Sequence, residues 1–500
     1  MDRFIIALDQ GTTSSRSILY NARLEKIDQA QAEFPQYFPA PGWVEHDPEE
    51  IWTSQRDTLL ALVRKNNLKP QDIAAIGITN QRETLIAWDK RTGKALAKAI
   101  VWQDRRTSAF CQSLKKKGLE AAVRRKTGLV LDPYFSGSKM HWLLKHNADV
   151  RQAASEKRLA FGTVDSWLIH KLTGGNVDST GNRHVIEASN ASRTLLMDIR
   201  TRRWDNGLLK IFGVPAHALP EILDSDACFG DVTVPELAGV RIHGVAGDQQ
   251  ASLFGHRCFT AGSLKNTYGT GCFLLKNIGD KYLPPPKGLL GTLAWTLKGK
   301  ATYAHEGAVM VGGAVIQFLR DGLGMLDNAA QSETLAAGLP DNEGVYFVPA
   351  FAGLGTPHWD PDARGLIIGL TRGTTRAHLA RAALESIAFQ SHDLCLAFGG
   401  PSGGRIRALN VDGGASQNRL LMQFQADLLG SEIRANESPE VTALGVAMLA
   451  ALGCGLVASP RDLLKLDLPL RIFKPAMAAA KRKTLIDKWH SAVQRSMGWA

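Results

Sequence analysis

The chain has 500 residues, of which 44% are hydrophobic and 21% are charged, and its formal net charge is +11. This length exceeds one ordinary core, so we expect at least two domains of a globular α/β protein. The basic residues stand in short scattered groups without interleaved aromatic residues. This pattern argues against nucleic-acid binding and favours a solvated basic surface that attracts anionic substrates such as nucleotides.

The six cysteines have neither paired nor metal-binding spacing, which predicts a reduced, cytoplasmic environment. The first apolar segment begins close to the N-terminus, so we expect no signal peptide. Residues 441–458 are uncharged and nearly long enough to span a bilayer, but Ala and Gly dominate them and no aromatic belt flanks them. We expect a buried helix there and no membrane insertion.

A run of polar residues interrupts the first apolar segment. Residues 4–8 predict a buried strand and residues 17–20 its return partner, separated by "DQGTTSSR". A polar turn is one interpretation of this stretch. The other is an anion site, because Gly11 admits a ligand close to the backbone and hydroxyls with successive N–H groups can surround phosphate oxygens. Asp9, at the end of the first strand, could then hold a hydrated Mg²⁺.

Two further strands are expected to end in polar clusters. A helix is expected to begin at Pro48, with Asp47 as its cap. Residues 73–78 predict the next strand and precede "TNQRET", and residues 99–102 predict another and precede "QDRR". Open α/β sheets bind ligands where strands end in this way.

After residue 240 a similar pattern recurs. "HGVAGDQQASLFG" predicts a strand, an acid and a helix, and "SLKNTYGTGCFLL" predicts a second hairpin with Thr267, Gly269, Thr270 and Gly271 in its bend. A third glycine turn, "LNVDGGASQNRLL", leads from a strand into a helix, whose N-terminus favours negative charge. The two hairpins suggest two related domains that face each other across a cleft.

Several side chains near the strand ends are candidates for chemistry, and each has a structural alternative. Asp248 is either the N-cap of a helix or a general base for a hydroxyl that attacks phosphorus. Arg82 and Glu83 are either a surface ion pair or a grip on a small polyol. Trp102 and Tyr134 are either core residues or aromatic walls for the C–H face of that polyol.

The motifs "LDQGTTSSR", "GITNQRET", "DPYFSGSK", "GVAGDQQASLFG", "KNTYGTGCF" and "VDGGASQN" follow one another along the chain. On these motifs the chain resembles the FGGY carbohydrate kinases, within the actin and hexokinase ATPase superfamily. The Arg-Glu pair together with Tyr-Phe-Ser-Gly resembles the members that phosphorylate glycerol rather than pentuloses. The resemblance implies ATP-dependent phosphorylation of glycerol to sn-glycerol 3-phosphate, the first step of glycerol catabolism, with Mg²⁺ as cofactor.

The resemblance also implies the architecture of the chain. It implies an α/β fold of two ribonuclease-H-like (actin/hexokinase-type) domains, each a mixed sheet flanked by helices, with an interdomain cleft. Residues 1–250 are expected to carry the glycerol site, the first phosphate loop and the catalytic base. Residues 251–500 are expected to carry the second phosphate loop and the adenosine pocket. A homodimer or homotetramer is expected.

Individual roles follow from the same resemblance. Asp248 is the expected catalytic base, and Asp9 is the expected Mg²⁺ ligand, through water. The expected glycerol-binding residues are Arg82, Glu83, Tyr134, Asp248 and Gln249, with Trp102 and Phe273 as apolar walls. The expected nucleotide-binding residues are Thr12, Thr13, Ser14, Arg16 and Thr270 at the phosphates, and Gly313, Gln317, Gly414 and Asn418 at the nucleoside.

Two segments depart from the family pattern. Segment 174–192 is longer than the usual link to "NASRT", and the region "VTVPELAGVRI" lacks the glycine-rich basic loop that binds a sugar-bisphosphate inhibitor in some members. Two alternative functions remain: a kinase for another polyol or a ketose, and a non-catalytic nucleotide sensor. The presence of Asp248 together with Asp9 argues against the sensor.

Overall fold

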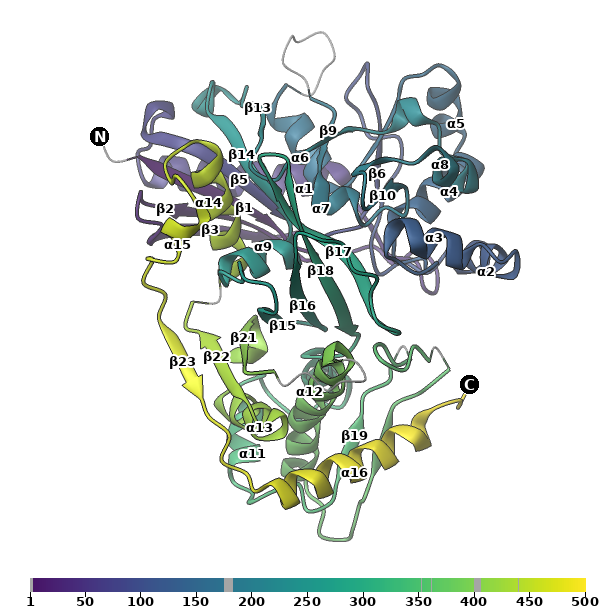
Figure 1. Cartoon of the computed structure of the whole chain (residues 1–500), viewed down its shortest axis with the longest axis vertical. Helices are drawn as coiled ribbons and strands as arrows, with labels where there is room; N and C mark the ends of the chain where they lie inside the picture. Colours follow the sequence, from purple (N-terminus) through teal and green to yellow (C-terminus); the bar gives the residue numbers. More distant parts are fainter. Residues whose placement is uncertain (1–2, 175–182, 352, 361, 400–405, 439) are drawn as a thin grey trace.

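Two β-sheets organise the chain (Figure 1). The structure is a computed structural model and describes residues 3–174, 183–351, 353–360, 362–399, 406–438 and 440–500. One sheet has six strands in the order β13-β14-β5-β1-β2-β3, and the other has seven in the order β17-β18-β16-β15-β21-β22-β23. Each contains both parallel and antiparallel neighbours, and helices flank both, which gives the expected two-domain α/β fold.

The strands of the six-stranded sheet are β1 (Phe4–Gln10), β2 (Ser14–Tyr20), β3 (Lys26–Glu33), β5 (Ile73–Asn80), β13 (Cys228–Asp231) and β14 (Arg241–Gly247). Those of the seven-stranded sheet are β15 (Leu264–Tyr268), β16 (Cys272–Gly279), β17 (Leu290–Leu297), β18 (Lys300–Val309), β21 (Ala408–Asp412), β22 (Glu432–Asn436) and β23 (Leu470–Phe473). The two-stranded sheets pair β4 (Glu45–His46) with β7 (Ala99–Ile100), β6 (Ile86–Asp89) with β8 (Leu159–Gly162), β9 (Val185–Glu187) with β12 (Glu221–Leu223), β10 (Met197–Asp198) with β11 (Arg203–Trp204), and β19 (Tyr346–Val348) with β20 (Leu366–Ile368).

Helices lie against both large sheets and around the small ones. In the first half of the chain they are α1 (Pro48–Lys65), α2 (Ser108–Lys116), α3 (Glu120–Thr127), α4 (Ser136–His146), α5 (Ala148–Ser155), α6 (Val164–Leu172), α7 (Ala188–Ala191), α8 (Asn206–Phe212) and α9 (Asp248–Gly255). In the second half they are α10 (Ala314–Gln317), α11 (Gln331–Ala337), α12 (Arg376–Gly399), α13 (Arg419–Leu429), α14 (Val441–Gly453), α15 (Pro460–Leu463) and α16 (Ala479–Ser496). The expected N-cap of α1 is confirmed, since the Asp47 carboxylate accepts a hydrogen bond from the backbone N–H of Glu49.

The first hairpin has a shorter turn than the sequence predicted. β2 begins at Ser14 instead of residue 17, and Asp9 pairs with Arg16 in the ladder, so residues 11–13 alone form the turn. The reason is that hydroxyls of β2 face α1: Ser15 Oγ lies 2.9 Å from the Oγ of Ser54. These hydroxyls satisfy one another between a strand and a helix, which lets a polar run continue the sheet.

Two other predicted strand limits also change. Thr267 lies inside β15 and not in the bend of the second hairpin, which consists of residues 269–271. The strand expected over residues 99–102 is the two-residue β7, and Trp102 lies in the turn that follows it. Its backbone N–H donates to the hydroxyl of Thr84 instead of extending a ladder.

The apolar segment near the C-terminus is the buried helix that its composition predicted. α14 packs against β1, β5 and β14 of the six-stranded sheet. Small residues permit this close approach: a Cβ added to Gly77 of β5 would lie 2.7 Å from the carbonyl oxygen of Val446. No helix in the described ranges is both long and apolar enough to cross a membrane.

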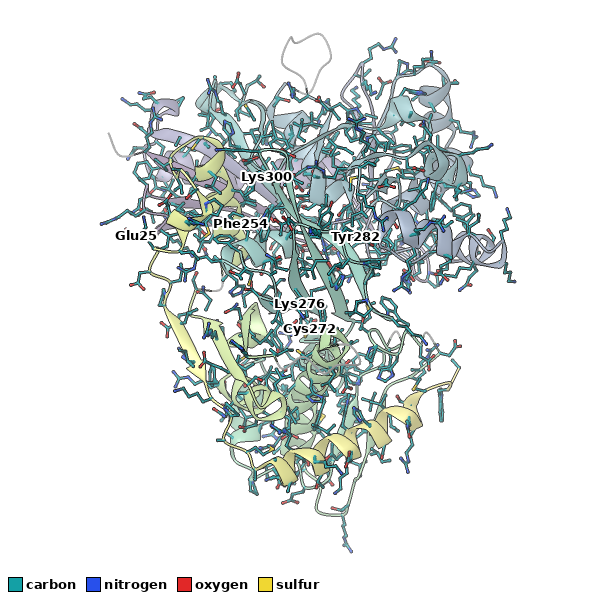
Figure 2. All side chains as sticks on the ribbon, in the orientation of Figure 1. Glu25, Phe254, Cys272, Lys276, Tyr282 and Lys300 are labelled. Atoms are coloured by element: carbon teal, nitrogen blue, oxygen red, sulfur yellow. The ribbon has the colours of Figure 1, made fainter. Side chains whose placement is uncertain are left out.

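The two sheets share a core around α9. Phe254 of α9 packs edge-on against Trp295 of β17, with ring centroids 5.0 Å apart. Figure 2 shows Phe254 and the β16 side chain of Lys276 in the middle of the molecule. A boundary at residue 250 would fall inside α9, and it stays a prediction. Of the long segment 174–192, residues 175–182 lie outside the described residues.

Candidate active site

Asp248 lies where β14 ends and α9 begins. It is the first residue of α9, and Gly247 occupies the N-cap position without a side-chain cap, so the N-cap interpretation of Asp248 is wrong by one residue. Its Oδ1 accepts a hydrogen bond from the backbone N–H of Gln249 at 2.7 Å. The side chain remains 32% exposed. A carboxylate in the first turn is stabilised by the helix dipole while part of it stays accessible.

Burial and nearby positive charges have opposite effects on the pKa of Asp248. Nε of Arg82 lies 3.3 Å from Oδ1 of Asp248. Burial raises the pKa of Asp248, and the charges of Arg82 and Lys265 oppose this rise. The two cations offset only part of the desolvation, and a carboxylate with a raised pKa is a stronger proton acceptor.

Arg82 and Glu83 are buried, so the interpretation as a surface ion pair is wrong. Both terminal nitrogens of Arg82 bind the Glu306 carboxylate, at 2.6 and 3.0 Å. Arg193 donates to Glu83 at 2.5 Å and to Glu306 at 2.9 Å. Burial alone would raise the pKa of Glu306, but Arg193 and Arg82 lower it to about 2. Four charged side chains therefore form one buried network, and Nε of Arg82 connects it to Asp248.

Sequence reasoning missed two members of this network. Glu306 lies in the interior of β18 and Arg193 follows α7, far apart in the sequence. A charged residue within an apolar run, as in "TYAHEGAV", was the available signal for Glu306. The backbone of Glu83 has φ 61°, a left-handed conformation that non-glycine residues rarely adopt and that clusters at functional sites.

Three aromatic side chains from different segments meet beside this network. The Trp102 ring lies 5.7 Å from Tyr134 and 6.2 Å from Phe273, both edge-on. The Tyr134 hydroxyl oxygen accepts from Nη2 of Arg82 at 3.4 Å. Phe273 is the second residue of β16 in the seven-stranded sheet, whereas Trp102 follows β7 and Tyr134 precedes α4, so this wall combines residues from both halves of the chain. The arrangement offers apolar surface next to charged and hydroxyl groups, as a polyol requires.

Gln249 follows Asp248 and connects α9 to the seven-stranded sheet. Its Oε1 accepts a hydrogen bond from Nζ of Lys265 at 2.5 Å. Lys265 is a buried residue of β15 that the sequence analysis did not single out. The predicted glycerol-binding side chains are thus held by residues from both halves of the chain.

Each of the two glycine turns is fixed by hydrogen bonds to its backbone carbonyl oxygens. In the first, the carbonyl oxygen of Thr12 accepts from the side chain of Gln36 at 2.9 Å. In the second, the carbonyl oxygen of Thr270 accepts from the N–H of Gly312 at 2.7 Å, and Gly313 N–H donates to Gly269 at 2.8 Å. Such rigid turns leave hydroxyls and N–H groups in set positions for phosphate oxygens.

Three of the four predicted nucleoside residues lie at the starts of helices. Gly313 is the N-cap of α10, and Gln317 is the last residue of α10. Gly414 follows β21, and no atom lies within 4 Å of where its Cβ would stand. Asn418 caps α13, because its Oδ1 accepts from the N–H of Leu421 at 2.8 Å. Their roles in binding a nucleoside stay predictions.

Asp9 is the penultimate residue of β1 and lies close to other acids. Its carboxylate lies 4.0 Å from Nη1 of Arg16, which binds Glu440 at 2.8 Å. The pKa of Asp9 is raised to about 6: burial is the largest cause, Arg16 opposes the rise, and Glu440 and Asp248 add to it. This excess of carboxylates suits a hydrated Mg²⁺. No cluster of three or more His, Cys, Asp or Glu residues that could hold a metal occurs in the described part of the chain.

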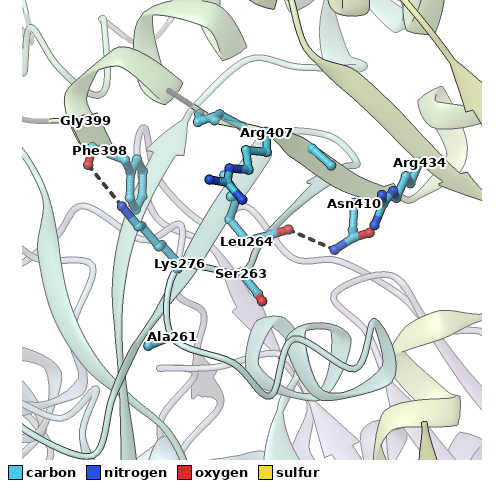
Figure 3. Close-up of a pocket in the computed structure, with 12 residues that line it drawn as sticks. Ala261, Ser263, Leu264, Lys276, Phe398, Gly399, Arg407, Asn410 and Arg434 are labelled. Atoms are coloured by element: carbon cyan, nitrogen blue, oxygen red, sulfur yellow. Dashed lines mark hydrogen bonds between the residues drawn. The ribbon is translucent and has the colours of Figure 1, made fainter. Parts of the chain in front are cut away.

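A cavity of about 510 Å³ lies apart from these residues, at the opposite ends of β15 and β21 (Figure 3). Lys276, Arg407 and Arg434 contribute its charged lining. Nζ of Lys276 donates to the carbonyl oxygen of Phe398 at 3.5 Å. None of the predicted substrate residues lines it.

Comparison with known proteins defines the class to which this fold and this site belong. Models of the FGGY family of carbohydrate kinases match residues 4–255 (N-terminal domain) and residues 264–454 (C-terminal domain). The chain belongs to the FGGY family of carbohydrate kinases. It is 51% identical to "Glycerol kinase" of Carboxydothermus hydrogenoformans and 50% identical to "Glycerol kinase 2" of Thermotoga maritima, each over 99% of both chains.

Solved structures agree with this family. The crystal structure of Plasmodium falciparum glycerol kinase with ADP matches with a TM-score of 0.89 at 34% identity, covering 99% of this chain and 98% of that one. A ligand-bound xylulose kinase from Lactobacillus acidophilus matches with a TM-score of 0.85 at 22% identity, covering 99% and 97%. The second likeness concerns the fold alone.

Proposed function

We propose that the chain transfers the terminal phosphoryl group of ATP to glycerol, forming sn-glycerol 3-phosphate and ADP, as the first step of glycerol catabolism. Relatives about half identical over nearly their whole length bear the name glycerol kinase. The observation that carries the proposal is the accessible Asp248 carboxylate, 3.3 Å from Arg82 and next to Gln249. Asp248 supplies a proton acceptor, and Arg82 and Gln249 supply polar groups close enough to bind the hydroxyls of one small polyol.

Asp248 acts as the general base in this proposal. A glycerol oxygen forms a bond to the terminal phosphorus of ATP, the bond from that phosphorus to the oxygen of ADP breaks, and the glycerol proton passes to Asp248. The N–H of Gln249 holds Oδ1 of Asp248, so the other carboxylate oxygen is the one that receives the proton. Positioning and charge, more than covalent chemistry, then supply the rate enhancement.

The other predicted residues bind the two substrates. Arg82, Glu83, Tyr134 and Gln249 bind the glycerol hydroxyls, and Trp102 and Phe273 cover its C–H face. Thr12, Thr13, Ser14 and Arg16 from one turn and Thr270 from the other bind the phosphates. Gly313, Gln317, Gly414 and Asn418 bind the nucleoside.

Asp9 would hold Mg²⁺ through water. The burial of Asp9 and the raised pKa of its carboxyl group support this assignment, because a divalent cation would offset the surrounding negative charge. When bound, the ion would neutralise phosphate charge. Arg16 contributes the permanent positive charge on the same side.

We further propose a cytoplasmic enzyme that forms a homodimer or homotetramer and has its domain boundary near residue 250. All six cysteines are free thiols, in keeping with a reducing compartment. Light scattering of the purified chain tests the assembly, and a monomer would contradict it.

A coupled assay of ADP release across glycerol, erythritol, xylulose and ribulose tests the function. We expect the highest kcat/KM with glycerol. A higher value with a ketose would assign the chain to another branch of the family. Tight ATP binding without turnover on any of the four would indicate a nucleotide sensor instead.

A further inference from the structure

Lys265 is a buried lysine beside the proposed glycerol site, and the proposed mechanism gives it no role. It has no exposed surface, although it is charged and lies in the interior of β15. Its Nζ donates to Oε1 of Gln249 at 2.5 Å and to Oγ1 of Thr267 at 2.7 Å. Burying an ammonium group is costly unless its hydrogen bonds are well defined, so this placement requires an explanation.

The far side of Lys265 is fixed by the sheet. Thr267 and Asp412 are register partners on the adjacent parallel strands β15 and β21. The Thr267 hydroxyl donates to Oδ1 of Asp412 at 2.5 Å, which leaves its lone pairs to Lys265. Oδ2 of Asp412 accepts from Ser252 of α9 at 2.8 Å. Lys265 is therefore held between a fixed hydroxyl and the Gln249 side chain.

This contact determines which end of the Gln249 amide faces Lys265. An amide has an oxygen that accepts and an NH₂ group that donates, whereas an ammonium only donates. Lys265 can bind the oxygen and never the NH₂ group. The NH₂ group of Gln249 then faces the Asp248 carboxylate, whose pKa it lowers by hydrogen bonding, and its second N–H is left for a ligand.

We propose that Lys265 is a positioning residue that fixes the Gln249 amide with its NH₂ group toward the substrate, so that Gln249 donates to one glycerol hydroxyl while Asp248 accepts from another group of the same molecule. The proposal rests on the proposed function. Lys265 does not touch the substrate and acts through Gln249.

The charges around Lys265 are compatible with this role. Burial lowers the pKa of Lys265 to about 8; Asp412, Asp248 and Glu306 oppose the decrease and Arg82 adds to it. The amine thus remains an ammonium at neutral pH and has no lone pair with which to accept from Gln249.

The first test is Lys265→Met, which keeps much of the side-chain volume and removes the donors. With the Gln249 amide free to rotate, we expect the KM for glycerol to rise about tenfold and the KM for ATP to stay the same. The change in kcat should be smaller than the change in the KM for glycerol, and it reflects the loss of a charge that opposes the raised pKa of Asp248. Lys276→Met is the matched control: Lys276 lies on the neighbouring strand β16 and faces the remote cavity (Figure 3), and its replacement should leave all three constants unchanged.

A second variant keeps the test decisive if Lys265→Met does not fold. In Gln249→Glu a carboxylate replaces the amide and pairs with Lys265, so the anchor remains while the donor to glycerol is lost. We expect the same rise in the KM for glycerol with normal thermal unfolding. An unchanged KM would overturn the donor assignment.

The double variant Lys265→Met/Gln249→Leu tests whether Lys265 affects glycerol binding through Gln249 or independently of it. If Lys265 acts through Gln249, the double variant loses no more glycerol affinity than Gln249→Leu alone. Additive losses would overturn the proposal. A wild-type protein that does not phosphorylate glycerol would instead refute the proposed function, so the two failures are distinct.

Discussion

The indole Nε1–H of Trp102 donates to Oγ1 of Thr12 at 3.0 Å. Trp102 belongs to the predicted wall of the glycerol site, and Thr12 belongs to the first phosphate turn. One hydrogen bond therefore joins the two predicted substrate sites. A shift of the aromatic wall would also shift a hydroxyl proposed to bind phosphate.

Trp102→Phe tests this connection. Phenylalanine keeps an aromatic ring that faces Tyr134 and Phe273, but it lacks the N–H that donates to Thr12. We expect kcat/KM for ATP to fall about fivefold, the equivalent of one hydrogen bond of about 1 kcal/mol. Steady-state kinetics with saturating glycerol measure it. Trp499→Phe, at a residue 77% exposed, is the control, and an equal effect there would disprove the link.

Asp248→Asn tests the general base. Asparagine preserves the shape of the side chain and cannot accept a proton, so we expect kcat to fall by about 100-fold or more. Calorimetric titration with glycerol should still show binding, because the other polar groups of the site are intact. Turnover equal to that of the wild type would refute the assignment of Asp248 as base.

Glu306→Gln tests the buried charge network. Removing this carboxylate leaves Arg82 and Arg193 with Glu83, and with the partly exposed Asp248 beside Arg82, to balance them. We expect the free energy of unfolding in urea to fall by about 3 kcal/mol or more.

The control for Glu306→Gln is Glu432→Gln. This change breaks the more exposed Glu432–Arg434 pair and should cost less than about 1 kcal/mol. Similar losses in the two variants would show that the buried network is not a major contribution to stability.

The pH dependence of stability should report the pair formed by His490 of α16 and Asp393 of α12. His490 Nε2 lies 2.9 Å from Asp393, and this hydrogen bond is the main cause of the raised pKa of His490; Asp487 acts in the same direction and burial against it. Because the folded pKa exceeds the unfolded value, the pair contributes fully below the unfolded pKa of about 6.5. The contribution is lost as the pH rises through the folded pKa.

His490→Gln should therefore destabilise the protein more at about pH 5.5 than at about pH 8.5, measured by urea unfolding at each pH. His217→Gln, at an exposed histidine, should show no such trend. A constant difference between wild type and His490→Gln across this range would contradict the linkage.

The sequence predicted the fold where local patterns agreed with the tertiary contacts. The cap at Asp47 and the apolar helix over residues 441–453 depend on nearby residues and composition, and both predictions are confirmed. The polar run over residues 14–16 was assigned to a turn because its burial depends on the hydroxyls of α1, which lie far along the chain.

The candidate site shows the same limit. Asp248, Arg82 and Gln249 stand in recognisable motifs at strand ends, and the sequence alone indicated them. Glu306 and Lys265 stand inside strands, where only pairing across the sheets shows what they bind. The sequence pattern of a strand predicts which residues share a face of the sheet. It does not predict which distant side chain forms an ion pair or a hydrogen bond with a buried charged residue.

The close packing of α14 on the six-stranded sheet leads to a final prediction, Gly77→Ala. A Cβ at residue 77 would lie 2.7 Å from the carbonyl oxygen of Val446, and the backbone of a buried helix cannot move away cheaply. We expect a loss of about 1–3 kcal/mol in the free energy of unfolding. Gly373→Ala is the control, since its Cβ would meet only the Thr371 hydroxyl at 3.8 Å. If both variants unfold at the same urea concentration, α14 does not require a glycine at position 77 and tolerates a wider spacing from the sheet than the structure has.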